Sequence, residues 1–108
     1  MNLSIDDLID KCQKIILAKG LDVYKREVDD YLKSIEGDKI EKLIEQGNRL
    51  SASFSVDENV EKSVVYYSRA LEEMKKNKKV DKEILLNISL VVYPVYSKVV
   101  NEIAMNKD

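Results

Sequence analysis

The stretch ILLNISLVVYPVYSKVV, residues 84–100, decides the fold because it is the most hydrophobic part of the chain. Its apolar residues recur at helical spacing on three stripes, so a helix here is apolar around its whole circumference. Asp81 can accept hydrogen bonds from the first backbone N–H groups of this helix, and Val80 and Leu85 are spaced as a hydrophobic staple. Such a helix needs neighbours on every side, so we expect it at the centre of the fold.

Two alternatives to a core helix deserve comparison, a buried strand and a membrane span. Pro94 disfavours the strand because it would remove a ladder hydrogen bond, and no alternating partner strand is visible. The apolar run is shorter than the ~20 residues that a bilayer span needs and contains Asn87 and Lys98. We therefore do not expect a membrane partner. Because proline lacks a backbone N–H, Pro94 predicts that the helix is kinked or split there.

Composition favours one water-soluble helical domain. The 108 residues are 35% charged and 44% hydrophobic, and they include one proline. The net charge of −2 gives no general attraction to nucleic acid or acidic lipid. The lone Cys12 cannot form an intrachain disulfide, and the N-terminal sequence MNLSIDD lacks the pattern of a signal peptide, so we expect a cytoplasmic location.

Capping signals predict four further helices before the apolar one. Ser4, Asp38 and Ser55 are each followed three residues later by an acidic residue, as at helix N-termini, and Gly20 and Gly37 mark helix ends. We predict an all-α fold, a compact single-domain bundle of about five helices over residues 1–108, with the last helix central. The predicted helices span residues 4–19, 22–36, 38–53, 55–76 and 81–105.

Gly47 lies on the apolar face of the third predicted helix, where glycine is less favourable than alanine by about 1 kcal/mol. Either a neighbouring helix crosses closely at this point, or the helix is kinked. The sequence leaves both explanations open.

The third and fourth predicted helices carry a spacing that resembles a single tetratricopeptide hairpin over about a third of the chain. The residues that carry the resemblance are Leu50, Phe54, Ser63, Tyr67 and Ala70. Gly47 stands where such a repeat has tryptophan, and no second repeat follows at a period of 34 residues. Two helices that pack antiparallel through small and aromatic residues explain the same spacing, and we favour that interpretation.

Catalytic and cofactor motifs are absent from the sequence. The three glycines stand far apart, so no phosphate-binding loop exists. The chain has no histidine, which removes Cys/His zinc clusters and the Ser–His and Cys–His pairs of nucleophilic catalysis. We therefore expect a non-enzymatic protein without a cofactor or a metal.

The leading functional hypothesis is a protein-interaction module, such as a small subunit, an adaptor or an inhibitor. Val65 and Tyr66 lie off the main apolar stripe of helix 55–76, and tyrosine is enriched at protein interfaces. With Arg69 they form the predicted face that docks on a protein partner or on a second copy of the chain. The alternative is that this helix lies between two others, which would bury the wider apolar face within the monomer.

The second hypothesis is a nucleic-acid-binding accessory protein that contacts phosphates without sequence preference. Its predicted contacts are the lysines that connect the last two helices: Lys75, Lys76, Lys78, Lys79 and Lys82. Lysines at the C-terminal end of a helix also complement the helix dipole and keep a loop soluble, and Glu72, Glu73, Asp81 and Glu83 dilute the positive field.

Overall fold

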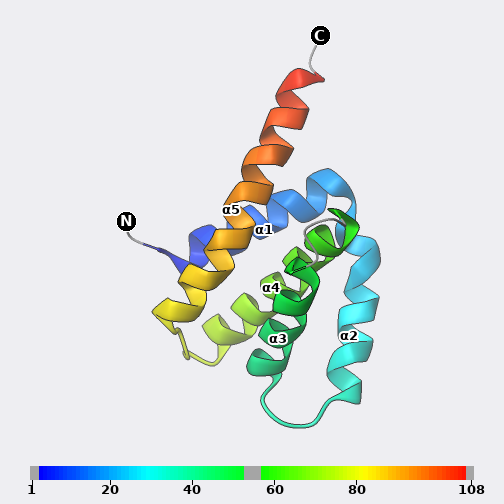
Figure 1. Ribbon diagram of the computed structural model, residues 1–108. Coiled ribbons are helices and arrows are strands. Elements are labelled where there is room, and N and C mark those ends of the chain that lie inside the picture. Colours follow the sequence, from blue (N-terminus) through cyan, green and yellow to red (C-terminus); the bar gives the residue numbers. More distant parts are fainter. Residues whose placement is uncertain (1–2, 53–56, 107–108) are drawn as a thin grey trace.

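Helices make up all the regular structure in residues 3–52 and 57–106, which are the residues that the computed structural model describes. This confirms the predicted all-α bundle of five helices. A short 3₁₀ turn separates the first two helices. The elements are α1 (Ile5–Lys19), η1 (Leu21–Tyr24), α2 (Lys25–Ser34), α3 (Lys39–Ser51), α4 (Asp57–Lys76) and α5 (Lys82–Met105) (Figure 1).

Side-chain caps begin three of the helices at the predicted residues. Ser4 Oγ accepts a hydrogen bond from the Asp7 N–H at 3.4 Å. Asp38 accepts from two N–H groups at the start of α3, and Asp81 accepts from two at the start of α5. At the other end of α1, Gly20 has φ +64°, a left-handed conformation that suits glycine. The predicted cap at Ser55, and Phe54 of the tetratricopeptide-like spacing, lie outside the described residues.

The central helix is α4, so the prediction that the last helix is central was wrong. Nine of the 20 residues of α4 are buried, against five of the 24 in α5. Every residue from Ser63 to Ser68 is buried, and six consecutive residues cover the full circumference of a helix. The neighbours of α4 are α1, α2, α3, η1 and α5, whereas α5 packs mainly against α1 (Figure 1).

The prediction chose the wrong central helix because hydropathy does not show how well a small polar residue fits a core. Ser63 is fully buried, and its hydroxyl donates to the Val60 carbonyl of the same helix at 2.5 Å. The serine is thereby satisfied without any partner outside α4. By contrast, Leu90 on the outer side of α5 is 67% exposed. The most hydrophobic helix is therefore not the most enclosed one.

α5 runs as one helix through Pro94, so of the two predicted outcomes the split does not occur, and the kink stays a prediction. Pro94 is exposed, and so is Leu90, whose carbonyl loses its partner because proline has no N–H. Water can reach this carbonyl, which makes a proline tolerable here. By length and composition α5 is also the one described helix that could cross a membrane, and 28% of its most apolar 18-residue window is buried in this fold.

α3 and α4 approach each other closely at Gly47. A Cβ atom added at Gly47 would lie 2.5 Å from Cε1 of Tyr67, inside the contact distance of carbon atoms. The Tyr67 ring is fully buried, and its hydroxyl donates to Asn48 Oδ1 at 2.7 Å, so displacing the ring would disturb the core. A close helix crossing therefore explains the glycine.

The Gly47→Ala variant should be less stable than the wild type. Alanine favours the helix by about 1 kcal/mol, but its methyl group must displace the Tyr67 ring, and overpacking of this kind destabilises by about 1–3 kcal/mol. Urea unfolding followed by circular dichroism should show a lower midpoint for Gly47→Ala. Glu45→Ala, at an exposed position of the same helix, should leave the midpoint nearly unchanged. A higher midpoint for Gly47→Ala would contradict the close crossing.

Candidate docking surface

The face predicted from Val65 and Tyr66 is enclosed within the monomer, so its assignment to the surface was wrong. Val65 is 3% exposed and Tyr66 is 2% exposed. The Tyr66 ring meets the Tyr31 ring of α2 edge-on, with centroids 5.6 Å apart, and its hydroxyl donates to Glu27 Oε2 at 2.9 Å. Helix α2 thus covers the side of α4 that the helical spacing left to solvent, as the alternative interpretation expected.

Arg69, the third residue of that predicted face, is partly exposed and engaged in ion pairs. Its guanidinium contacts Asp29 of α2 at 3.0 Å and Glu73 of α4 at 3.8 Å. Exposed pairs of this kind contribute little to stability. They nevertheless satisfy the arginine within the monomer, so Arg69 is not an unsatisfied anchor for a partner.

Tyrosine hydroxyls connect neighbouring elements of the bundle, which accounts for much of the tyrosine content without an interface. Each of five hydroxyls donates to an acceptor on a different element. The pairs are Tyr24 with Glu58, Tyr31 with the Lys42 carbonyl, Tyr66 with Glu27, Tyr67 with Asn48, and Tyr93 with Asp7. In each case the ring is wholly or partly buried while the hydroxyl reaches a polar group nearer the surface.

These contacts raise the pKa of tyrosines and lower the pKa of a carboxyl group. Burial, followed by the hydrogen bond to Glu27, raises the pKa of Tyr66. The hydrogen bond to Asp7 is the main cause that raises the pKa of Tyr93. The same hydrogen bond, with help from Lys11, lowers the pKa of Asp7. The folded chain therefore favours a charged Asp7 and neutral tyrosines.

Cys12 is the remaining group with reactive potential, and the fold makes it inert. Its side chain is fully buried on α1, and burial raises the pKa of the thiol to about 12. A protonated, inaccessible thiol is neither a nucleophile nor a metal ligand. Among the described residues, no group of three acidic or cysteine side chains is placed to hold a metal ion.

The lysine loop, defined here as residues 75–82, is exposed along its length. Lys75 is ion-paired with Asp6 of α1. The other four lysines, Lys76, Lys78, Lys79 and Lys82, make no ion pair with any side chain in the described part of the chain. The structure thus leaves most of the predicted lysine cluster accessible to an anion.

Lys78 has an unusual backbone conformation within this loop. Its φ is +56°, and the Lys78 and Lys79 N–H groups donate to the Lys75 and Met74 carbonyls. This pattern is a Schellman motif that ends α4, with Lys78 at the left-handed position where glycine is preferred. A side chain there is unfavourable by about 1 kcal/mol.

An open apolar groove lies between α1 and the C-terminal part of α5. Its volume is about 280 Å³. Leu17, on its rim, is 78% exposed, and Ile103 opposite is 49% exposed. The groove residues are Lys14, Leu17, Ala18, Tyr96, Val99, Val100 and Ile103.

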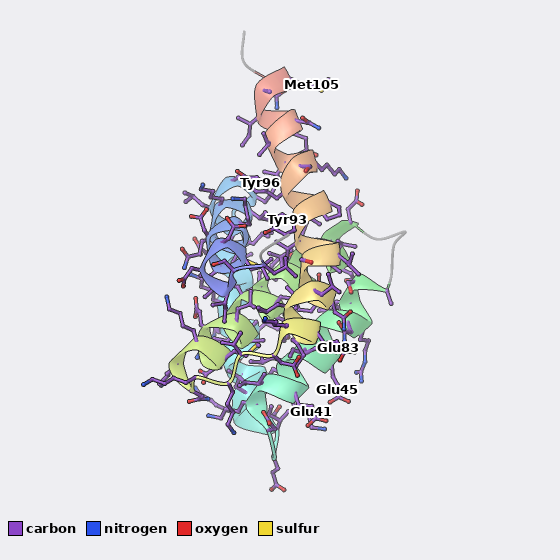
Figure 2. All side chains as sticks on the ribbon, turned by 90° about the vertical axis from the view of Figure 1, so that its left-hand side faces the viewer. Glu41, Glu45, Glu83, Tyr93, Tyr96 and Met105 are labelled. Atoms are coloured by element: carbon purple, nitrogen blue, oxygen red, sulfur yellow. The ribbon has the colours of Figure 1, made fainter. Side chains whose placement is uncertain are left out.

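The groove exists because α5 extends beyond the helices that cover it. Figure 2 shows Tyr93 and Tyr96 beside α1, while Met105 lies at the free end of α5, beyond the rest of the bundle. The Lys11 ammonium stands 5.0 Å from the centroid of the Tyr96 ring, which joins the two helices just below the groove. Sequence reasoning missed this site, although Leu17 lies off the buried stripe of α1 and Ile103 follows Val99 by one turn.

A second recess, of about 310 Å³, lies on the other side of α5 against α4 and the end of α1. It is lined by two lysines and three carboxylates, most of which are engaged in ion pairs with one another. Lys19 lies 3.2 Å from Glu102 and 3.7 Å from Glu61, and Lys98 lies 3.6 Å from Asp57. Because its ionic groups pair among themselves, this recess offers less to a ligand than the apolar groove.

Comparison of the chain with protein-family models, with curated proteins and with solved structures gave no match. The tetratricopeptide-like spacing is therefore unsupported by any family model. The antiparallel contact of α3 and α4 through Gly47 and Tyr67 accounts for that spacing physically.

Alkaline pH should destabilise the fold through its tyrosines. Unfolded tyrosines ionise near pH 10, whereas the pKa values of Tyr24, Tyr66, Tyr67 and Tyr93 are raised in the folded chain. This stabilisation is complete below the unfolded pKa and is lost as pH rises above it. Urea midpoints measured over a pH series should therefore fall above about pH 10.

The ultraviolet absorbance of tyrosinate gives a direct check. It should appear together with the loss of the helical circular dichroism signal, and the decline should be smaller in Tyr66→Phe. If the tyrosines ionised fully near their ordinary pKa while the helical signal persisted, the hydroxyl contacts would be weaker than the structure indicates.

Proposed function

We propose that this chain is a non-enzymatic interaction module that docks a partner through the apolar groove between α1 and α5. The observation that supports the proposal is the exposure of Leu17, a large apolar side chain that is 78% exposed on the rim of an open apolar groove. Scattered exposed leucines are ordinary on protein surfaces, but a contiguous apolar patch is typical of an interaction site.

The composition of the groove agrees with a docking role. Lys14 is the one charged residue among those that line it, and its ammonium is paired with Asp10 at 3.0 Å. Interface centres are depleted in charge and favour aromatic and aliphatic side chains, which Tyr96, Val100 and Ile103 supply here. Burying apolar area contributes roughly 25 cal/mol per Å², so covering these side chains would favour association.

A second candidate function is binding of nucleic acid at the lysine loop. The observation that favours it is the left-handed backbone of Lys78, in a loop with three other lysines that make no ion pair within the described residues. A strained residue retained at the expense of stability is often functional. The negative net charge and the acidic residues Asp81 and Glu83 oppose this candidate, which therefore stands second.

The groove is tested by a pair of variants with matched exposure. Leu17→Glu places a charge on the rim of the groove, whereas Val23→Glu places the same charge on η1 at a residue that is 75% exposed and outside the groove. In affinity purification from the native host, partners retained by the wild type and by Val23→Glu should be lost with Leu17→Glu. Equal retention by both variants would exclude the groove as the docking site.

The lysine loop is tested by Lys78→Gly, which should increase the stability of the fold while it removes one positive charge from the loop. Glycine relieves the left-handed strain, so the free energy of unfolding should rise by about 1 kcal/mol. If the loop binds phosphates, the same variant should bind a labelled oligonucleotide more weakly and reduce the slope of log affinity against log salt by about 1. Lys33→Gln, which removes a lysine from α2, should alter neither property. Absence of oligonucleotide retention by the wild type at low salt would eliminate this candidate.

A further inference from the structure

The apolar stripe with which α5 faces the bundle continues beyond the bundle. Leu85, Ile88, Val92 and Val99 are buried along this stripe. Ile103 follows Val99 by one turn on the same side of the helix, yet it is 49% exposed, on the open side of the groove that it shares with Leu17 of α1. Figure 1 shows the end of α5 extending past α1 and the other helices. Beyond Val99, the apolar side of α5 is therefore only partly covered within the monomer.

We propose that the groove between α1 and α5 receives the end of α5 from a second copy of this chain, which forms a two-fold dimer. This inference rests on the proposed docking function and names its partner. A helix that docks in a groove presents anchors at positions i, i+3 and i+4. Val100, Ile103 and Ala104 at the end of α5 have this spacing.

The argument for a second copy is that one chain carries both halves of the contact. The groove is formed by the last turns of α1 and by the same end of α5 that supplies the anchors. Because groove and anchors lie together at one end of the molecule, a two-fold axis near that end places each α5 end in the other groove. Such a contact is isologous and closes after two copies.

Charge complementarity supports this arrangement. The described last turn of α5 carries no basic side chain, so no side chain of that turn offsets the negative end of the helix dipole. Glu102 in that turn is held by Lys19 of the same chain, 3.2 Å away. In the dimer, Lys14 on the rim of one groove approaches the C-terminal end of the other α5. Its pair with Asp10 is exposed and weak, so it leaves the ammonium able to make this contact.

The size of the contact predicts a dimer that dissociates on dilution. A two-fold axis counts every side chain twice, so Leu17, Val100 and Ile103 contribute six apolar side chains in all. This is a small core beside the ~800 Å² per partner of a standard stable interface. We therefore expect the full chain to change from monomer to dimer as its concentration rises through the micromolar range.

Sedimentation equilibrium of the full chain tests the dimer, with circular dichroism as the check on folding. Ile103→Glu should weaken association at least tenfold, since it removes an anchor from the centre of each contact. Leu90→Glu introduces the same charge on α5 at an exposed residue outside the groove, and it should associate like the wild type. Leu17→Glu, on α1, should weaken association as Ile103→Glu does. Because Leu17 is not on α5, this result would show that local fraying of α5 is not the cause.

Disulfide trapping identifies which surfaces meet. A tagged Leu17→Cys chain mixed with an untagged Ile103→Cys chain under oxidising conditions should form a mixed disulfide, because the native Cys12 is buried. Substituting Leu90→Cys for Ile103→Cys should give much less of this product.

The outcomes separate the dimer from the docking function. A wild type that stays monomeric at all concentrations, or a dimer insensitive to Leu17→Glu and Ile103→Glu, would overturn the second-copy inference. If Leu17→Glu still removed a different protein in affinity purification, the groove would remain a docking site with another occupant. If Leu17→Glu had no effect in either experiment, both proposals would fail.

Discussion

The enclosure of α4 is the constraint on which the rest of the structure depends. Six consecutive uncharged residues, Ser63–Ser68, face every direction around this helix, so each side of it must be covered. Helix α3 can approach only because Gly47 has no side chain where the Tyr67 ring lies. On the opposite sides α1 and α2 supply Leu8, Cys12, Ile15 and Val28 to the same core. The other four helices are therefore arranged around α4 because each of its sides must be covered.

An enclosed helix with two tyrosines and two serines must also satisfy polar atoms inside a core. Ser63 solves this locally, by donation to the Val60 carbonyl of its own helix. The tyrosines solve it at long range, since their hydroxyls extend to Glu27 on α2 and Asn48 on α3. An unsatisfied buried hydroxyl would be unfavourable by about 1–3 kcal/mol. These contacts therefore select one packing of α2 and α3 among the several that the apolar faces alone would allow.

The sequence predicts features that depend on residues close together in the chain, and it fails for features that depend on contacts between distant elements. Ser4, Asp38 and Asp81 act on N–H groups within three residues, so these helix starts could be predicted. Which helix is most buried could not be predicted, because burial depends on distant partners. Glu27, for example, lies 39 residues from Tyr66 in sequence. The apparent docking residues Val65 and Tyr66 failed for the same reason. Helix periodicity gives the direction of a side chain but not what lies opposite it.

The same distinction separates the stable part of the fold from its candidate site. The α3–α4 crossing and the tyrosine contacts hold the interior, whereas the groove is lined by α1 and α5 alone. Leu17 and Ile103 contribute little to the monomer, because water already reaches most or half of each side chain. Apolar residues that stabilise nothing in the monomer also reduce its solubility. The docking proposal gives these two side chains, on opposite sides of one groove, a contact that would bury them.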